Sequence, residues 1–188
     1  MSAQPAAPAP GAAEEEAILA PPVEIVIEAP GWRRTPLAEV APRAARATLE
    51  TLGLAPDLYE VVILACDDER IRGLNESFRG RAVPTNVLSW PAEDLAPDRP
   101  GGVPARPAAG QPGAPAHLGD IALALGVCTR EAEEQGKALG DHLAHLVVHG
   151  VLHLLGYDHE SDADAERMED LERRILARLG VDDPYAVR

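Results

Sequence analysis

A stretch near the C-terminus, residues 145–159, constrains this chain more than any other part, because it holds four of the six histidines in an apolar context. His149 and His153 are four residues apart, so they lie on one face of a helix. Gly156 favours the end of that helix, and the Gly-Tyr-Asp-His return brings His159 toward the first two. Three neutral nitrogen donors with a vacant fourth position are typical of catalytic zinc, whereas structural zinc usually has four ligands, mostly cysteine.

The alternative set of His145, His149 and His153 is excluded by geometry. Over eight residues a helix rises about 12 Å, whereas two ligands of one zinc ion lie at most about 4 Å apart. We therefore interpret His145 as a half-buried histidine, or as one that supports the ligands from behind without binding the metal, and His117 and His142 as surface residues.

For any single histidine on this apolar helix, a hydrogen-bonded core residue is the simpler interpretation. Three histidines whose spacing allows a common ligand favour the metal site instead. Gly150 narrows the range of reactions that the metal site could catalyse. Zinc peptidases with a His-Glu-x-x-His motif use a glutamate at this position as general base. Its absence argues against peptide hydrolysis by that mechanism.

Length and charge limit the class of protein. A chain of 188 residues fits one domain with a substantial core. The net charge of −14 disfavours diffuse electrostatic binding to nucleic acid or anionic membranes. A polyanionic substrate would therefore need a local basic patch.

Cysteines and apolar runs indicate the compartment. Cys66 and Cys128 lie in apolar contexts, which favours a reduced interior over a disulfide framework. No run approaches the roughly 18 apolar residues of a membrane helix, and residues 14–16 are acidic where a signal peptide is basic. We expect a cytoplasmic protein that is neither exported nor inserted into a membrane.

The predicted organisation is one domain, residues 21–182, between two tails. Residues 1–20 hold few large apolar groups, which predicts a disordered N-terminal tail, and residues 183–188 form a C-terminal tail. Within the domain, residues 91–117 are rich in Pro, Gly and Ala, which predicts a flexible loop.

Hydrophobic patterns predict the secondary structure. Segment 59–65 is apolar at nearly every position, which favours a central strand covered on both faces, and the other strands are predicted at 23–28, 85–90 and 119–125. Helical periodicity covers 37–52, 68–79, 127–139, the histidine stretch and 165–179. The first helix is expected to kink or to begin at Pro42. The predicted caps are Thr35, Asp67 or Asp68, Asp141 and Ser161.

Four blocks of sequence resemble one known family in the family's order. His149-Gly-Val-Leu-His153-Leu-Leu-Gly-Tyr-Asp-His159 looks like the signature of the YbeY family, the bacterial zinc-dependent endoribonucleases of ribosomal RNA maturation. The other blocks are Leu74-Asn-Glu-Ser-Phe-Arg79-Gly, Pro84-Thr-Asn-Val-Leu-Ser-Trp-Pro91 and Leu118-Gly-Asp-Ile121. The resemblance covers roughly residues 23–180. The acidic N-terminal tail, the long 91–117 segment and Trp90, where phenylalanine is commoner, depart from the family pattern.

The resemblance implies an α+β fold in which a four-stranded mixed sheet is packed by about five to six helices, with zinc-peptidase-like architecture. It implies that His149, His153 and His159 bind one zinc ion per chain and that Arg79 is a functional arginine. The implied activity is that of a single-strand-specific, zinc-dependent endoribonuclease in rRNA processing, ribosome maturation and ribosome quality control. RNA, the small ribosomal subunit and assembly factors are the implied partners.

Phosphodiester cleavage develops negative charge on the nonbridging oxygens. A zinc ion beside the Arg79 guanidinium is a minimum set of groups for stabilising that charge. A zinc-bound water, with its pKa lowered to about 7, could attack directly or accept a proton from a ribose 2′-hydroxyl, and the sequence does not decide between them. Tyr157 and Asp158 are candidates for hydrogen bonds that orient the imidazoles. A turn-stabilising role for Asp158 fits equally well.

Arginines around one predicted helix offer a local basic patch in this acidic chain. We predict RNA contacts for Arg70, Arg72 and Arg81 beside Arg79, with scattered surface charge as the simpler alternative. A second group of arginines, at residues 33–46, is the weaker candidate.

Two other functions fit the same residues. A metal-stabilised ribosome-assembly factor without turnover would use zinc to fold, and a metallohydrolase of another class would act on peptides or small molecules. The glycine at position 150 argues against the peptidase form of the latter.

Overall fold

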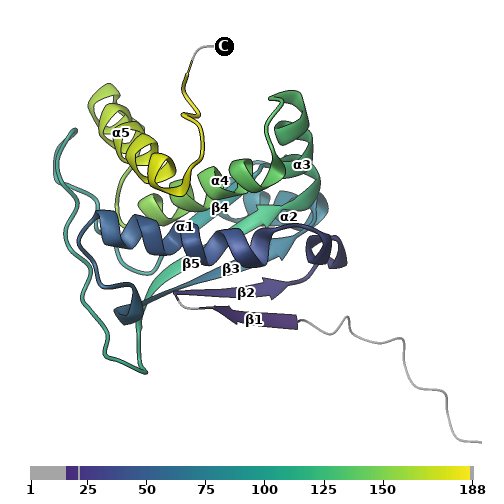
Figure 1. Cartoon of the computed structure of the whole chain (residues 1–188). Coiled ribbons are helices and arrows are strands. Elements are labelled where there is room, and N and C mark those ends of the chain that lie inside the picture. Colours follow the sequence, from purple (N-terminus) through teal and green to yellow (C-terminus); the bar gives the residue numbers. More distant parts are fainter. Residues whose placement is uncertain (1–15, 21, 187–188) are drawn as a thin grey trace, which may run out of the picture.

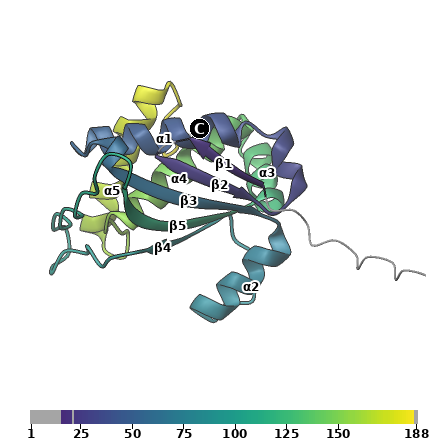
Figure 2. The ribbon, with the colours of Figure 1, turned by 90° about the horizontal axis from the view of Figure 1, so that it is seen from below.

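The computed structural model describes residues 16–20 and 22–186 and has an α+β fold built on one mixed sheet. The strands are β1 (Glu16–Ala20), β2 (Val23–Ile27), β3 (Tyr59–Cys66), β4 (Val87–Pro91) and β5 (Ala116–Ala124). The helices are α1 (Leu37–Thr51), α2 (Asp68–Arg79), α3 (Leu125–Glu134), α4 (Leu139–Leu154) and α5 (Asp162–Leu179), with short 3-10 turns at Pro30–Arg34 and Pro56–Leu58. Helices α1 and α4 pack on one face of the sheet under α5, and α2 lies on the opposite face (Figure 1, Figure 2).

The strand order is β1-β2-β3-β5-β4, with β2, β3 and β5 parallel and both edge strands antiparallel to their neighbours. β3 is the central strand, as its apolar sequence predicts. Val61 and Ile63 are fully buried under the helices, whereas Val62 and Leu64 on the other face are only half-buried. That face is covered in part by α2, so the expected burial of β3 on both faces is incomplete (Figure 2).

The sheet has five strands where four are predicted, because residues 16–20 belong to it. Composition predicts this segment to be part of a disordered tail, and for these five residues that prediction is wrong. They pair antiparallel with β2 along their whole length. An open sheet edge offers backbone hydrogen bonds to a strand whatever its side chains are, which composition does not capture. Residues 1–15 of the predicted tail lie outside the described residues.

Two of the four predicted helix caps are confirmed, and Thr35 is not one of them, because the N-cap of α1 is Pro36. Asp67 caps α2 by accepting a backbone N–H at 2.8 Å, and Ser161 caps α5. Asp141 does not cap α4, because that helix begins at Leu139 and Asp141 lies in its first turn. Pro42 lies inside α1 and does not begin it.

Helix α4 lies between the sheet, α1 and α5, and most of its side chains are buried. It approaches the sheet closely at Gly150, where an added Cβ would lie 2.8 Å from Ile121 Cδ1 and 3.3 Å from Ser89 Oγ. Overpacking of this kind typically costs about 1–3 kcal/mol. Gly150 therefore allows α4 to pack closely on the sheet. This packing role is separate from the absence of a catalytic base at position 150.

Residues 92–115, most of the predicted loop, form no helix or extended strand. The segment is nevertheless tied to the domain. Leu95 is buried, and the Gly101 N–H donates to the Asp164 carboxylate at 2.7 Å. Its flexibility stays a prediction.

The predicted C-terminal tail also contacts the domain, through Tyr185, whose hydroxyl donates to Glu172 on α5. Cys66 and Cys128 are free, and burial raises the pKa of both thiols to about 12, which makes them inert core residues. Among the helices of residues 22–186, none is long and apolar enough to span a bilayer.

Deleting residues 2–20 removes β1 and exposes the edge of β2. We expect the free energy of unfolding to fall by about 1–3 kcal/mol, since each lost backbone hydrogen bond contributes roughly 0.5–1.5 kcal/mol net. Urea unfolding measures this. Deletion of residues 2–14 leaves β1 whole and should keep the midpoint of the full chain. Equal midpoints for the two deletions would contradict a stabilising role of β1.

Candidate metal centre

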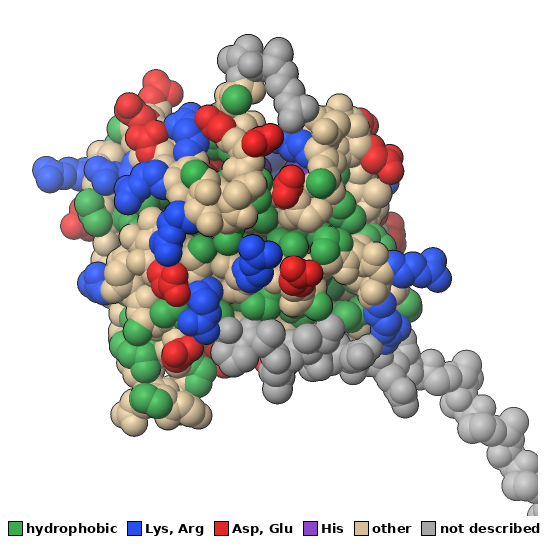
Figure 3. Space-filling view, viewed as in Figure 1, with side chains coloured by type: hydrophobic (Ala, Val, Ile, Leu, Met, Phe, Trp, Pro, Cys, Tyr) green, Lys and Arg blue, Asp and Glu red, His purple; other side chains and the backbone are tan. Residues whose placement is uncertain are grey.

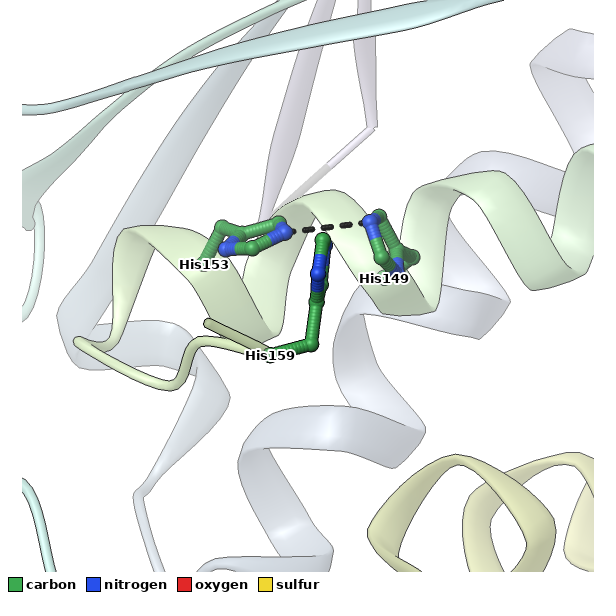
Figure 4. Close-up of side chains that lie close together, drawn as sticks. All are labelled: His149, His153 and His159. Carbon is green, nitrogen blue, oxygen red and sulfur yellow. Dashed lines mark hydrogen bonds between the residues drawn. The ribbon is translucent and has the colours of Figure 1, made fainter. Parts of the chain in front are cut away.

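The C-terminal end of α4 and the turn after it bring three histidines together. His149 and His153 lie one turn apart on α4. Gly156 then reverses the chain with φ of +85°, and a Cβ there would lie 2.6 Å from the backbone carbonyl carbon of Leu95, so conformation and space both require glycine. The return places His159 beside the two helix rings (Figure 4).

The ligand nitrogens of these three histidines all lie within 4.8 Å of one another. The Nε2 atoms of His149 and His153 are 3.0 Å apart, and the ring centroid of His159 is 5.4 Å from that of His149 and 5.1 Å from that of His153. The structure thus brings together the residues singled out by their spacing. Their role as metal ligands remains a prediction.

Hydrogen bonds at Nδ1 fix the tautomers of the two helix histidines. His149 Nδ1 is 2.7 Å from Glu172 Oε1, and His153 Nδ1 is 2.9 Å from the carbonyl oxygen of Tyr157. Since a carbonyl and an ionised carboxylate only accept, each Nδ1 carries the hydrogen and each Nε2 presents a lone pair.

This arrangement suits a divalent cation. In the neutral tautomers with hydrogen on Nδ1, the two Nε2 atoms, 3.0 Å apart, present lone pairs to one another. A proton is disfavoured there, because burial, followed by repulsion from His149 and His159, lowers the pKa of His153 to about 4. Neutral imidazoles are good zinc ligands, and acceptors behind their Nδ1 atoms orient them. The donor set therefore fits one zinc-like ion held by three histidines.

Glu172 is a site residue that the sequence predictions missed. It lies on α5 and is 0% exposed. Burial alone would raise the pKa of its carboxyl, but hydrogen bonds from His145, His149 and Tyr185 outweigh burial and hold the pKa at about 2. A signal was available, because position 172 falls on the apolar face of the last predicted helix, where a carboxylate needs buried partners.

The remaining histidines lie outside the triad. His145, as expected, is not part of it, and its Nε2 is 3.2 Å from Glu172 Oε2. The prediction for His142 is wrong: this residue is buried, with Nε2 2.9 Å from Glu131 Oε2, because it faces α3 and not solvent. Burial, only partly opposed by Glu131, lowers the pKa of His142. His117 lies at the surface, as predicted.

Tyr157 and Asp158 contribute through the backbone of the return. The carbonyl of Tyr157, not its hydroxyl, accepts from His153. The carboxylate of Asp158 accepts the backbone N–H of His159 at 2.6 Å, which matches the turn-stabilising alternative. Orientation of an imidazole by either side chain remains a prediction.

A pocket of about 190 Å³ opens beside His153 and is also lined by Arg79 and Ser89. Arg79 ends α2 and Ser89 lies on β4, so three separate segments of the chain meet at this pocket. The acidic residues lining it are Glu93, Asp94 and Asp158. The predicted functional arginine and a predicted metal ligand thus share one cavity.

The other predicted RNA contacts are not among the described residues lining this pocket. Arg70 pairs with Glu28 at 3.2 Å, and Arg72 pairs with Glu69 at 2.5 Å. Arg81 is exposed just after α2. An RNA-binding role for these three arginines remains a prediction.

The second arginine group lies on a surface of mixed charge. Arg43 pairs with Glu39 at 3.5 Å, and Arg46 pairs with Asp57 at 3.1 Å. On the face that carries α1, acidic and basic side chains are interspersed (Figure 3). Such a surface is typical of solvated charge more than of a polyanion-binding face.

Comparison with known proteins identifies the family. The family described as Endoribonuclease YbeY matches residues 31–180, a range that contains all four sequence blocks. This chain belongs to the YbeY family. Proteins named Endoribonuclease YbeY from Dinoroseobacter shibae, Jannaschia sp. and Ruegeria pomeroyi are 60%, 55% and 54% identical to it, over 87%, 87% and 88% of this chain and 90%, 99% and 98% of theirs. The solution structure of TM1509 from Thermotoga maritima superposes with a TM-score of 0.49 at 20% identity, covering 88% of this chain and 99% of that one.

Blocks that resemble the YbeY family also position the pocket. Asn75 Nδ2 donates to the carbonyl of Val83 at 2.8 Å, which secures the segment that follows Arg79. Asn86 Nδ2 donates to Glu131 at 2.9 Å, which ties the start of β4 to α3. These asparagines therefore anchor the segment after α2 and the start of β4, the two elements that supply Arg79 and Ser89 to the cavity.

Replacing His159 with alanine removes one of the three nitrogen donors and leaves α4 unchanged. We expect zinc retained after dialysis to fall from about one equivalent per chain toward zero, since catalytic zinc normally needs three protein ligands. Elemental analysis measures this. His117→Ala, a surface histidine change, should keep the wild-type zinc content. Full zinc in the His159→Ala protein would exclude this residue as a ligand.

Proposed function

We propose that this protein is a zinc-dependent endoribonuclease that cleaves single-stranded RNA. The observation that carries the proposal is the pair of Nε2 lone pairs of His149 and His153, which face one another beside His159 at the edge of the Arg79 pocket. Relatives named endoribonuclease supply the substrate class. RNA cleavage by a metal centre is the function that accounts for both.

Different residues of the chain would have different roles in the proposed cleavage. His149, His153 and His159 would hold the ion, which when bound supplies Lewis-acid charge beside the scissile phosphate. Arg79 would neutralise charge that develops on the nonbridging oxygens. The Ser89 hydroxyl lines the same pocket and can donate a hydrogen bond to a phosphate oxygen.

Attack by water or by the ribose 2′-hydroxyl would be distinguished by an RNA with one 2′-deoxy sugar at the cleavage position.

The charge of the pocket supports dependence on a cation. Arg79 is basic, but the carboxylates of Glu93, Asp94 and Asp158 line the same space. An RNA phosphate would therefore meet net negative charge there unless a divalent ion offset it. Substrate binding, as well as cleavage, should need the ion.

An exposed phenylalanine ring, packed against a half-buried tryptophan, supports a preference for unpaired RNA. Phe78, which precedes Arg79, is 64% exposed, although periodicity places it on the apolar face of α2 with Ile71. Its ring lies 5.4 Å from the ring of Trp90 in an edge-to-face contact. Unpaired bases stack on exposed aromatic rings with about 1–3 kcal/mol per base. A duplex offers no free base faces for such contacts.

For the cellular role we propose rRNA processing, ribosome maturation and ribosome quality control in the cytoplasm. Two buried, free cysteines are compatible with a reduced compartment. The small ribosomal subunit and its assembly factors follow as partners from the family resemblance.

RNase assays on the wild type, His153→Ala and Arg79→Ala, run with elemental metal analysis, test the proposal. We expect the wild type to cleave single-stranded RNA and His153→Ala to lose zinc and cleavage together while keeping its circular dichroism spectrum. Equal cleavage by these two proteins would indicate a contaminating nuclease and refute the proposal. Unfolding of His153→Ala would favour the assembly factor without turnover. Cleavage of a peptide panel with RNA intact would favour another metallohydrolase.

Arg79→Ala should keep the wild-type zinc content and lower kcat for RNA cleavage about 100-fold or more, because losing one preorganised charge-stabilising group commonly costs about 10²–10³ in kcat. Arg178→Ala is the matched control, since Arg178 is an exposed arginine on α5 that pairs with Glu50 and lies outside the predicted RNA contacts. Unchanged cleavage by the Arg79 variant would remove this residue from the mechanism.

Phe78→Ala should raise KM for single-stranded RNA about tenfold with little change in kcat, because one base-stacking contact is lost. Steady-state kinetics on unstructured oligonucleotides measures both constants. Val103→Ala is the control, since Val103 is a similarly exposed apolar residue, at 68%, on the long loop. If Phe78→Ala leaves KM unchanged, the aromatic pair does not stack on the substrate.

A further inference from the structure

Glu172 is a buried carboxylate whose two oxygens serve different parts of the molecule. Oε1 accepts a hydrogen bond from His149 Nδ1 at 2.7 Å. Oε2 is 3.2 Å from His145 Nε2 and also accepts from the Tyr185 hydroxyl. Because both oxygens are engaged, the carboxylate has one orientation, and that orientation is set partly by a residue near the end of the chain.

Tyr185 lies in the segment after α5, which turns back alongside that helix (Figure 1). Its ring contacts the ring of His145 edge-to-face with centroids 5.8 Å apart, and the Arg173 guanidinium lies 5.0 Å from its centroid. Arg173 also pairs with Asp183 of the same segment at 3.6 Å. These contacts hold the hydroxyl on the buried carboxylate even though Tyr185 is 36% exposed.

We propose that Glu172 is the positioning residue for His149 and that Tyr185 positions Glu172, so that the C-terminal segment completes the metal centre. This inference rests on the proposed function. With the Nδ1 hydrogen held by Glu172, the His149 ring keeps its Nε2 lone pair directed at His153. Loss of a carboxylate behind a ligand imidazole usually costs about 10–100-fold in metal affinity.

The contacts among His145, His149 and Glu172 fit hydrogen bonding better than the binding of a second metal ion. His145, His149 and Glu172 do offer ligand atoms within 4.8 Å of one another. Their separations of 2.7 and 3.2 Å are those of hydrogen bonds, however. A cation among them would also have to displace the Nδ1 hydrogen of His149 and compete with the Tyr185 hydroxyl for Oε2.

Two conservative variants test the inference. Glu172→Gln replaces the carboxylate by an amide of the same shape, and Tyr185→Phe removes one hydroxyl from a partly exposed ring. Competition with a chromophoric chelator measures apparent zinc affinity, and the absorption bands of the cobalt(II)-substituted proteins report ligand geometry. We expect zinc binding about 10–100-fold weaker in Glu172→Gln and about threefold to tenfold weaker in Tyr185→Phe. Cobalt bands should be altered in both, with circular dichroism spectra like that of the wild type.

Matched controls separate positioning from general effects. Tyr59→Phe removes a tyrosine hydroxyl that donates to the Pro107 carbonyl, and Glu166→Gln changes an exposed carboxylate on α5. Both should bind zinc as the wild type does. Wild-type affinity and cobalt bands in Glu172→Gln and Tyr185→Phe would overturn the inference and leave the proposed function standing. A wild type that binds no zinc would overturn both. If Glu172→Gln does not fold, Tyr185→Phe decides.

Discussion

Helix α4 is packed between a sheet and two other helices, and it nevertheless carries mostly buried imidazole rings, whose nitrogens favour partners from the protein. The structure satisfies the Nδ1 atoms of His149 and His153 with a carboxylate on α5 and a carbonyl on the return. Their Nε2 atoms are left to converge with His159. The carboxylate on α5 and the carbonyl of the turn after α4 thus together orient the two helix rings of the candidate metal centre.

Local signals predicted the fold and the triad well. The four-residue spacing of His149 and His153 and the turn at Gly156 depend on helix geometry and on one left-handed φ, both of which act within a few residues. The central position of β3 followed from its apolar run. Partners from distant parts of the chain were not predictable in this way. β1 forms because β2 offers a free backbone edge, and Glu172 matters because α5 delivers it to His149, 23 residues away.

Acidic composition and an RNA substrate are reconciled at the scale of the pocket. The chain carries a net charge of −14, and the pocket itself contains more carboxylates than guanidinium groups. Recognition by a broad basic surface is therefore a poor description of this molecule. The proposed stacking on the exposed Phe78 ring and the proposed metal ion would account for the same substrate without one, because stacking depends little on net charge.

Gly150 affects how easily the sequence of this site could evolve toward a His-Glu-x-x-His motif. A glutamate at this position is the single difference that would complete a His-Glu-x-x-His motif on α4. Its Cβ would lie 2.8 Å from Ile121, which is itself fully buried and has little room to move. A change of Gly150 to glutamate would therefore require the end of the Ile121 side chain to shift beneath the helix. The close contact between α4 and β5 therefore adds a packing cost to the one residue change that separates the two motifs.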